Sequence, residues 1–306
     1  MSDSRFVGIF DSGVGGLSVW REVVRQLPHE QTLYLADQAH VPYGHRRLAE
    51  VRGFSEGITR FLLDLGAKII VVACNTASAA ALHRLRSTFP DVPFVGMEPA
   101  VKPAVERTRN GVVGVIATPA TFQGQLFASL VERYAGDVQV LTQVCPGLVE
   151  AVEAGALDTP ETEMLVRECV SPLVEASVDQ LVLGCTHYPF LRPAIERVIA
   201  DKLRPADKLR PAEGVTVVDP APAVARQTGR VLARLGLASI PSADAARRRD
   251  RAGHHVFYTS GDAATFASMI GQLLPAIGKD VDVRPVYWRA GHIETAVIRT
   301  SARRQG

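Results

Sequence analysis

The chain has 306 residues, of which 47% are hydrophobic, and this length is enough for two domains with their own cores. Its 34 Lys and Arg residues against 32 Asp and Glu residues leave a net charge of +2, which argues against a nucleic-acid-binding or membrane-binding surface. The N-terminus lacks a basic segment followed by a long apolar stretch, and no apolar run approaches the ~20 residues of a membrane span, so we expect a soluble cytoplasmic protein.

The first third of the chain alternates predicted strands and helices, which is typical of an α/β fold with a parallel sheet. Short apolar runs rich in β-branched residues predict the strands, and apolar residues at helical spacing predict the helices. In chain order these elements are a strand Phe6–Phe10, a helix Leu17–Leu27, a strand Thr32–Ala36, a helix Arg46–Leu65, a strand Ile69–Val72, a helix Ala77–Thr88 and a strand Val92–Val95.

A glycine-rich turn, Asp11 to Gly16, joins the first strand to the first helix. Its glycines allow a tight turn and close approach of a ligand to the backbone. It is not a Walker loop, because Leu17-Ser18 stands where Lys-Ser/Thr is needed. A dinucleotide site needs an acidic residue at the end of the next strand, and only Asp37 stands there. Nucleotide binding is therefore disfavoured. The turn still offers the Asp11 carboxylate and the Ser12 hydroxyl at a strand end.

The strand Ile69–Val72 ends just before Cys74, and the helix-starting residues Asn75, Thr76 and Ser78 follow. Ligands of open α/β sheets bind outside the carboxyl ends of the strands. The sequence therefore predicts a thiol at a ligand-binding position, next to amide and hydroxyl groups and the free N–H groups of a helix start.

The remainder of the chain repeats the alternation of strands and helices. The predicted elements are a strand Gly111–Ile116, a helix to Tyr134, a strand Val138–Leu141, a short helix Cys145–Gly155, a helix Thr159–Ala176, a strand Leu181–Leu183, a helix Pro193–Ile199, a strand Val215–Val218, a helix from Asp219 to Leu235, a strand Val256–Thr259, a helix Ala263–Leu274 and a strand Val283–Val286. Cys185 follows one of these strands, as Cys74 does earlier. Cys74 lies 63 residues after Asp11 and Cys185 lies 67 residues after Thr118, which indicates two related lobes.

Three segments are predicted to lie at the surface without chemistry. The six-residue tandem ADKLRP ADKLRP over Ala200–Pro211 predicts a lengthened loop, which costs little stability. The arginine-rich stretch Ser239–His255 predicts a solvated loop, and the tail past Thr300 is expected to fray.

Tyr43, in the polar loop Asp37–Gly44, either packs within the loop or closes over a small ligand.

The four cysteines, Cys74, Cys145, Cys169 and Cys185, contain no C-x-x-C pair and do not indicate a disulfide scaffold. Either Cys74 or Cys185 alone fits a buried structural residue, but two cysteines in matched strand-end settings favour chemistry. Two thiols that face one cleft suit inversion of a stereocentre, because one removes a proton from one face of a carbon and the other returns a proton to the opposite face. Helix N-termini, Asp11 near one thiol and His187 near the other would assist ionisation.

Seven motifs occur in order over residues 6–225, namely FDSGVGG, ADQAHVPYG, VVACNTASA, GMEPAVKPA, CPGLVEAVEAG, LVLGCTHYPFL and VDPAPAVA. With these motifs the chain closely resembles the aspartate/glutamate racemase superfamily. The resemblance implies two similar parallel-sheet lobes related by a pseudo-two-fold axis, with the active site between them, residues 1–98 with 213–306 forming the first lobe and 99–212 the second. It also implies a cofactor-independent, two-base interconversion of L- and D-glutamate that supplies D-glutamate for peptidoglycan.

Carried over by motif, the resemblance implies that Cys74 and Cys185 are the catalytic acid/bases. It implies that Asp11 assists Cys74, that His187 assists Cys185, and that Glu153 is a further acidic residue near the site. The implied substrate contacts are Asp11, Ser12, Tyr43, Gly44, Asn75, Thr76, Thr118, Thr121, Thr186 and His187. No metal site is implied. Gly147 departs from the bulkier residue that is common in the family.

Other activities were weighed against this resemblance. A pyridoxal-phosphate racemase needs a Schiff-base lysine, and none of the five lysines lies in a motif typical of a site. A zinc hydrolase built on Cys74, Cys185 and His187 is disfavoured, because C-x-H is poor metal spacing. Racemisation of aspartate or another amino acid on the same scaffold stays open. Some family members are reported to inhibit DNA gyrase, so a protein-binding role also stays open, and a homodimer is kept as an expectation for the assembly.

Overall fold

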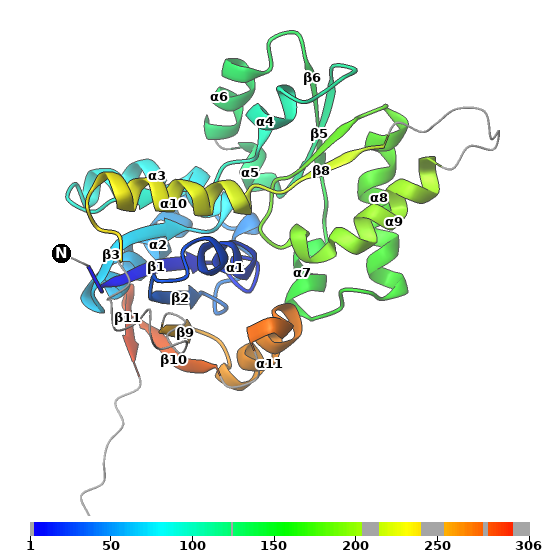
Figure 1. Cartoon of the computed structure of the whole chain (residues 1–306). Helices are drawn as coiled ribbons and strands as arrows, with labels where there is room; N and C mark the ends of the chain where they lie inside the picture. Colours follow the sequence, from blue (N-terminus) through cyan, green and yellow to red (C-terminus); the bar gives the residue numbers. More distant parts are fainter. Residues whose placement is uncertain (1–2, 124, 204–213, 240–253, 278–280, 296–306) are drawn as a thin grey trace, which may run out of the picture.

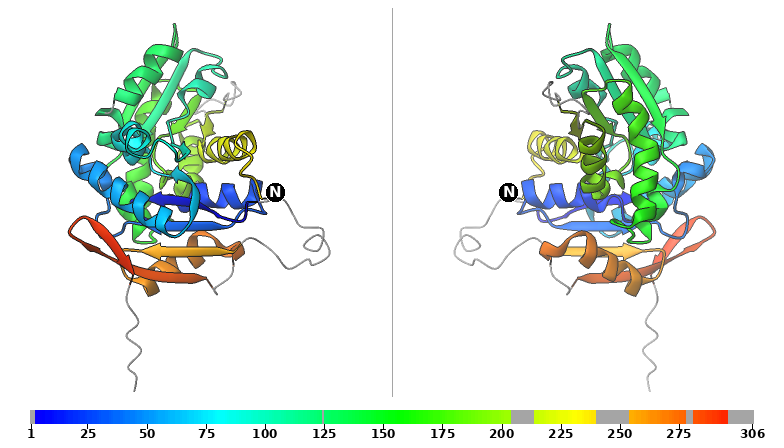
Figure 2. Two further views of the ribbon diagram at one scale, coloured as in Figure 1. Left: turned by 90° about the vertical axis from the view of Figure 1, so that its left-hand side faces the viewer. Right: turned by 90° about the vertical axis from the view of Figure 1, so that its right-hand side faces the viewer.

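The computed structural model describes residues 3–123, 125–203, 214–239, 254–277 and 281–295, which form two α/β lobes (Figure 1). The first lobe is built on a seven-stranded sheet and the second on a four-stranded sheet. The second lobe lies against one side of the first, whereas strands β9 to β11 lie on the side away from it (Figure 2). This architecture confirms the predicted α/β fold with two parallel-sheet lobes.

The strands of the first sheet have the spatial order β11-β10-β9-β2-β1-β3-β4. They span Phe6–Asp11 (β1), Thr32–Ala36 (β2), Ala67–Val72 (β3), Phe94–Val95 (β4), His255–Thr259 (β9), Asp282–Arg289 (β10) and His292–Thr295 (β11). All neighbours pair in parallel except β10 and β11. Phe10 of β1 is in register with Val72 of β3, so Asp11 and Cys74 leave the sheet at the same edge.

The second sheet is parallel throughout and has the order β6-β5-β7-β8. Its strands span Val112–Ala117 (β5), Gln139–Val144 (β6), Gln180–Leu183 (β7) and Thr216–Val218 (β8). Ile116 is in register with Leu183, so Thr118 and Cys185, each two residues further on, lie at one edge. The chain crosses back to the first lobe after β8, where α10 packs on α1. The predicted limits assign residues 213–306 to the first lobe, whereas β8 pairs with β7 in the second sheet. The other predicted lobe limits stay a prediction.

Helices connect the strands and cover both sheets. They are α1 (Leu17–Gln26), α2 (Leu48–Asp64), α3 (Asn75–Thr88), α4 (Val101–Val105), α5 (Pro119–Gln123), α6 (Gln125–Tyr134), α7 (Leu148–Glu153), α8 (Pro160–Glu175), α9 (Arg192–Leu203), α10 (Ala221–Arg234) and α11 (Ala263–Leu273), with 3-10 turns η1 (Tyr43–His45), η2 (Tyr188–Leu191) and η3 (Pro275–Ile277). Side-chain caps begin α8 and α11, because the Thr159 hydroxyl accepts from the Thr162 N–H and the Asp262 carboxylate from the Thr265 N–H. Because helices cover the first sheet, all six residues of β3 are buried.

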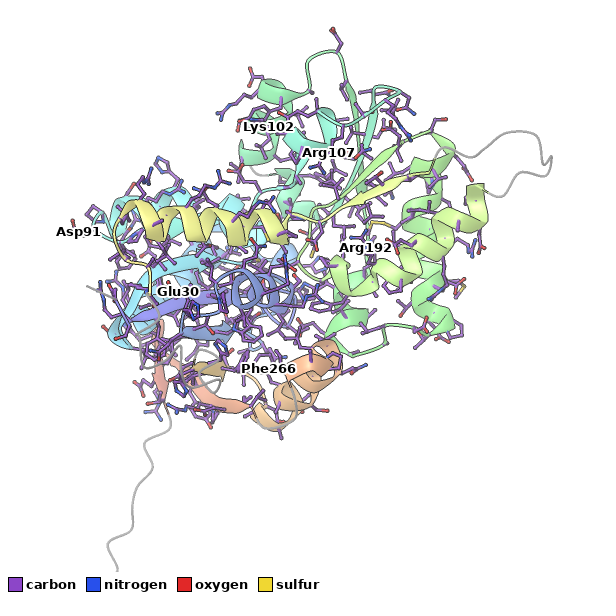
Figure 3. The ribbon with its side chains drawn as sticks, viewed as in Figure 1. Glu30, Asp91, Lys102, Arg107, Arg192 and Phe266 are labelled. Carbon is purple, nitrogen blue, oxygen red and sulfur yellow. A yellow bond between two sulfur atoms is a disulfide. The ribbon has the colours of Figure 1, made fainter. Side chains whose placement is uncertain are left out.

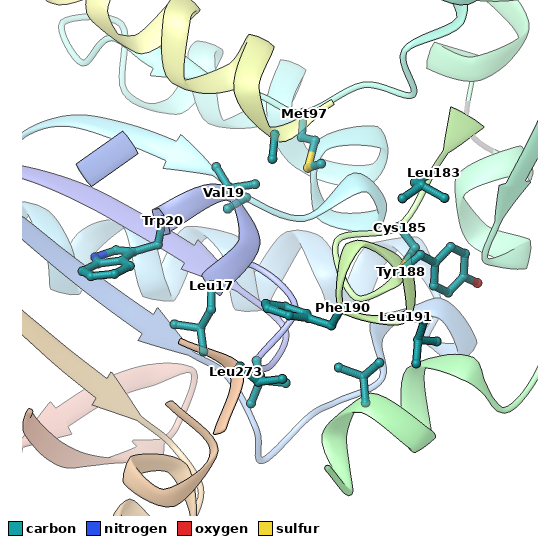
Figure 4. Close-up of a cluster of buried hydrophobic side chains, with 14 of the residues drawn as sticks. Leu17, Val19, Trp20, Met97, Leu183, Cys185, Tyr188, Phe190, Leu191 and Leu273 are labelled. Carbon is teal, nitrogen blue, oxygen red and sulfur yellow. The ribbon is translucent and has the colours of Figure 1, made fainter. Parts of the chain in front are cut away.

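One hydrophobic core extends across both lobes. Figure 4 shows Leu17 and Trp20 of α1 in the same cluster as Leu183, Cys185 and Tyr188 of the second lobe. Burying one large apolar side chain contributes about 1.5–3 kcal/mol, so this shared core opposes separation of the lobes. The Cys185 thiol is therefore held in packed surroundings at the lobe boundary.

The limits of several predicted elements differ from those observed. The sequence predicts a strand Val283–Val286, whereas β10 runs from Asp282 to Arg289 and returns as the antiparallel β11 after Gly291, whose φ is +81°. The predicted helix Cys145–Gly155 is shorter, since α7 begins after Gly147, which has a left-handed φ of +80°. These turns need positive φ, which glycine adopts without strain.

Two of the segments predicted to be loops fall largely outside the described residues. Helix α9 continues to Leu203, so the first four residues of the ADKLRP tandem are helical rather than loop. The rest of the tandem, most of the arginine-rich stretch and the tail past Thr300 lie outside the described residues. Within the described ranges, no helix combines the length and apolar character of a membrane span.

Cys145 and Cys169 form a disulfide within the second lobe, with their Cα atoms 5.4 Å apart. The sequence did not indicate it, because the two cysteines are 24 residues apart and only the packing of α8 beside the end of β6 brings them together. Cys74 and Cys185 are free.

A buried ion pair closes the amino-terminal end of the first sheet. Lys68 Nζ lies 2.7 Å from Glu30 Oε2, and both side chains are almost inaccessible to water. Lys68 Nζ also donates to the Asp3 carbonyl at 2.7 Å, and the Ser239 hydroxyl donates to Glu30 Oε2 at 2.9 Å. The pair therefore joins the segment before β1 and the segment after α10 to β3.

Replacing Lys68 by Ala should lower the free energy of unfolding by about 3–5 kcal/mol, because the buried Glu30 carboxylate would lose the positive charge beside it. Urea unfolding followed by circular dichroism measures the change. Lys102→Ala is the matched control, since its contact to Glu106 is exposed and 3.8 Å long, and it should change stability by no more than about 1 kcal/mol. Figure 3 labels Glu30 and Lys102 in the first and second lobe. Equal losses in the two variants would contradict this role of Lys68.

Candidate active site

The two free cysteines stand at the carboxyl ends of equivalent strands in the two lobes. Cys74 follows β3 and is the N-cap of α3, where its sulfur accepts from the Ala77 N–H at 3.4 Å. Cys185 follows β7. Both side chains are buried, and both line one cavity between the lobes. The strand-end position predicted for each thiol is confirmed by the described structure.

This cavity is narrow: about 280 Å³ of space not filled by protein atoms lies among its lining residues, and that figure includes space open to solvent. Its lining is polar at most positions. The lining residues are Ser12, Pro42, Tyr43, Gly44, Cys74, Asn75, Thr76, Thr118, Val149, Cys185, Thr186 and His187. Ten of the predicted site residues are thus brought together, and Asp11, Thr121 and Glu153 lie behind them, bonded to lining residues or to neighbouring groups.

Hydroxyl groups link the two lobes on one side of the cavity. Thr76 Oγ1 lies 3.1 Å from Thr118 Oγ1, which in turn lies 3.1 Å from Thr121 Oγ1. Thr76 is in α3 of the first lobe, whereas Thr118 and Thr121 belong to the β5–α5 segment of the second. These uncharged donors can bind carboxylate oxygens from both lobes at once.

Several buried polar atoms at the cavity have no protein partner. Among the residues described, both side-chain polar atoms of Asn75 and Oδ1 of Asp11 are buried without a hydrogen-bond partner. Such atoms are costly unless something satisfies them. A polar ligand in the cavity would supply the missing partners.

Cys185 belongs to a chain of interactions that carries a charge. Its sulfur lies 3.6 Å from His187 Nδ1, and His187 Nε2 lies 2.7 Å from Glu153 Oε1. Burial disfavours the charged imidazole, but the hydrogen bonds to Cys185 and Glu153 outweigh burial and raise the pKa of His187 well above its usual value. His187 is therefore positively charged near neutrality, and a positive charge beside a thiol favours the thiolate.

Glu153 is held from both lobes. Its Oε1 accepts from the Val14 N–H at 2.7 Å as well as from His187, and its Oε2 accepts from Gln38 Nε2 at 3.3 Å. Burial opposes ionisation, but the hydrogen bond from His187 and those from Val14 and Gln38 prevail and lower the pKa of Glu153. The carboxylate is thus available as the partner of the imidazolium.

The glycine-rich turn makes room for these side chains. A Cβ atom at Gly13 would come within bonding distance of Glu153 Oε1, and one at Gly15 would lie 2.6 Å from Thr186 Oγ1 and clash with the His187 ring. The close approach expected at this turn is therefore made by side chains of the second lobe.

Cys74 lies in a different electrostatic setting. Burial, followed by the charge of Asp11, raises the pKa of the Cys74 thiol well above its usual value. Asp11 is fully buried, and burial also raises the pKa of its carboxyl. Asp11 Oδ2 accepts from the Gly16 N–H at 2.8 Å. Near neutrality Cys74 is therefore a protonated thiol, whereas Cys185 lies next to the His187 ring.

Tyr43 lines the cavity and is also anchored behind it. Its hydroxyl donates to Asp37 Oδ2 at 2.6 Å, and Asp37 also accepts from Ser260 Oγ and Trp288 Nε1, each at 2.7 Å. The two interpretations of Tyr43 as a packed loop aromatic and as a wall of a ligand site are therefore compatible.

Pro42 and Val149 line the cavity without having been predicted. Pro42 directly precedes Tyr43 and Gly44 in the ADQAHVPYG motif, so that motif could have indicated it. Val149 is an apolar helix residue that nothing in the sequence distinguishes from a core residue.

Gly147 lines a neighbouring cavity of about 340 Å³, where a Cβ would meet Leu165 at 3.0 Å. A bulkier residue there would fill that neighbouring space and strain the turn before α7.

The family model described as Asp/Glu/Hydantoin racemase matches residues 7–228. A glutamate racemase of Roseiflexus sp. (strain RS-1) is 48% identical over 275 residues, which is 89% of this chain and 94% of the relative.

Solved structures give the same result. A glutamate racemase from Francisella tularensis in complex with D-glutamate is 26% identical with a TM-score of 0.74, covering 92% of this chain and 97% of the other. A glutamate racemase from Escherichia coli in complex with L-glutamate is 30% identical with a TM-score of 0.72, with the same coverage of 92% and 97%.

Nitrogen-15 NMR of the histidine rings should show His187 doubly protonated near pH 7, because its pKa is raised. His255 is the internal control, since burial lowers its pKa to about 4 and its ring should be neutral at the same pH. Replacing Glu153 by Gln removes the carboxylate that favours the charged ring, so the pKa of His187 should fall. A neutral His187 ring in the unmodified protein at pH 7 would contradict the charge assignment.

Proposed function

Because the chain belongs to the Asp/Glu/hydantoin racemase family, we propose that it interconverts L- and D-glutamate by a two-base reaction in which Cys74 and Cys185 act on opposite faces of the substrate Cα. The proposal extends the activity of the glutamate racemase relatives to this chain and assigns its residues. It uses the thiols of the chain itself and no added cofactor.

The observation that carries the proposal is the position of the two free thiols. They come from different lobes, stand at matching strand ends and line the same small cavity. A racemase must take a proton from one face of a carbon and deliver one to the other, so it needs two groups on opposite sides of its substrate. Two thiols presented by two facing lobes meet that requirement.

The two thiols lie in different surroundings, and we assign them opposite roles. Cys185, beside the His187 ring, acts as the thiolate that removes the Cα proton and becomes a thiol. Cys74, kept protonated by burial and by Asp11, gives its proton to the opposite face of the carbanion and becomes a thiolate. The reverse direction starts from that state of the pair, and exchange with solvent restores the first.

The remaining cavity residues bind and orient the substrate. Asn75, with two unpartnered buried atoms, and the hydroxyls of Thr76 and Thr118 are neutral groups suited to carboxylates. Hydrogen bonds to the α-carboxylate stabilise the negative charge that develops when the Cα proton leaves. Ser12, Tyr43, Gly44, Thr121 and Thr186 complete the proposed substrate contacts.

The cellular role follows from the product. We propose that the chain works in the cytoplasm and supplies D-glutamate for peptidoglycan, as the resemblance implies. The homodimer stays a prediction, which light scattering of the purified chain tests.

In heavy water, each enantiomer of glutamate should take one solvent deuterium into its Cα position when it inverts, because the thiol that delivers the proton exchanges with solvent. Chiral separation with mass spectrometry of the product measures this. Aspartate assayed in parallel tests the alternative substrate and should turn over far more slowly. Inversion with retention of the original hydrogen would contradict the two-base reaction.

Replacing Cys74 or Cys185 by Ala should lower racemisation by about 10²–10⁴-fold, since each change removes the acid or base from one face. Polarimetry or a coupled assay for D-glutamate measures the rate. Cys145→Ala is the control, because this cysteine belongs to the disulfide and not to the thiol pair, and its rate should stay close to that of the unmodified chain. A loss with Cys145→Ala as large as with Cys74→Ala would show that the thiol pair is wrongly assigned.

A further inference from the structure

We propose that Gln38 is a positioning residue that holds Glu153 from the opposite lobe, fixes His187 through it, and so acts on the half of the reaction that Cys185 performs. The inference rests on the proposed function. Gln38 is not among the residues that line the cavity, and its side chain contacts one recognised site residue, Glu153.

The orientation of the Gln38 amide is set within the first lobe. The Thr259 hydroxyl accepts from the Gly261 N–H at 2.9 Å, so its own hydrogen is free to donate to Gln38 Oε1 at 2.7 Å. Thr259 is fully buried, and a Cβ at Gly261 would lie 2.9 Å from the Gln38 Cβ, so the β9–α11 loop packs tightly on this side chain. With its oxygen fixed by Thr259, the amide must direct its N–H₂ group toward Glu153.

The contact of Gln38 with Glu153 differs from the other contacts of this carboxylate. Oε1 takes both short hydrogen bonds, from Val14 N–H and His187 Nε2. Oε2 accepts from Gln38 at 3.3 Å, and within the described residues no other hydrogen bond to Oε2 is present. Rotation about the Cγ–Cδ bond of Glu153 moves both oxygens together, so the contact of Gln38 with Oε2 adds a third restraint on the carboxylate plane to the two hydrogen bonds that hold Oε1.

The plane of the carboxylate matters because His187 follows it. The imidazole lies between Glu153 and Cys185, so a rotated carboxylate would move the ring away from a sulfur that is already 3.6 Å distant. Residues behind a catalytic group act through such placement, and small displacements cost rate. Cys74 has no link to Gln38 of this kind, since its partner is Asp11. The effect should therefore fall on one thiol.

A second glutamine supplies a matched control. Gln272 of α11 donates through Nε2 to the Gly155 carbonyl at 2.8 Å, at the end of the same helix that carries Glu153. It joins the two lobes through a side-chain amide, as Gln38 does, but it bonds to the backbone and not to the carboxylate. A role in lobe docking alone would give the two glutamines the same behaviour.

The equilibrium constant between L- and D-glutamate limits what rate measurements in the two directions can distinguish. L- and D-glutamate are mirror images and have equal free energies in water, so any variant must lose kcat/KM by the same factor in both directions. Substrates labelled with deuterium at Cα separate the two halves, because only the thiol that abstracts the label feels it. If proton transfer at Cys185 is slowed, the isotope effect rises for the enantiomer whose hydrogen Cys185 removes and falls for the other.

The test compares Gln38→Leu, Gln38→Glu and Gln272→Leu, each as the full chain, with both labelled enantiomers. Gln38→Leu should lower kcat/KM about tenfold, as expected for loss of one hydrogen bond to a charged group, and the two isotope effects should diverge. Gln38→Glu keeps the acceptor for Thr259 but sets a second carboxylate against Glu153, so its loss should be larger with the same divergence. Gln272→Leu should change kcat/KM by less than about twofold and leave the isotope effects together.

The outcomes that overturn the proposal are distinct from failure of the proposed function. If the unmodified chain racemises glutamate with solvent exchange but the Gln38 variants match it, or match Gln272→Leu, Gln38 has no positioning role. A loss of activity in which both isotope effects move together also overturns it, since that result shows a general change of the site. Circular dichroism verifies folding, and Gln38→Glu, which keeps the length and shape of the side chain, serves if Gln38→Leu does not fold. An unmodified chain without racemase activity would instead overturn the proposed function.

Discussion

A positive charge buried between two lobes needs a negative partner, because burial by itself disfavours ionisation. The His187–Glu153 ion pair, 2.7 Å long, meets this need and places a charged ring next to Cys185. Its members come from the segment after β7 and from α7, and Val14 and Gln38 of the first lobe complete the hydrogen bonds to Glu153. The chemistry of one thiol therefore depends on contact between the lobes, which the shared hydrophobic core maintains.

The site is symmetric in position and asymmetric in charge. Cys74 and Cys185 stand at equivalent strand ends, yet one faces a buried carboxyl and the other an imidazolium. Pairs of titratable groups whose surroundings shift their protonation apart identify acid and base. The two strand-end thiols therefore differ in their charged neighbours although their positions in the two lobes match.

The sequence predicts most of this structure because its signals are local. Runs such as Ile69–Val72 are β-branched and buried, and Cys74 and Cys185 follow their strands directly, so the thiols could be placed before any coordinates were known. The pairing of Cys145 with Cys169, the hairpin after Val286 and the contact of Gln38 with Glu153 could not, because each depends on tertiary packing between segments that carry no local signal. Val149 was missed for the same reason, as it resembles any core valine.

The glycine-rich turn after β1 has a consequence for how such turns are recognised. Turns of this kind receive phosphates in many proteins because their N–H groups are free. Here the Val14 N–H takes a carboxylate from α7, and the space above Gly15 holds an imidazole. The anion bound at the turn is therefore the Glu153 carboxylate of the same polypeptide, in the place where other proteins bind a separate ligand. A methyl group at position 13 would displace the Glu153 carboxylate from the turn, and one at position 15 would displace the His187 ring.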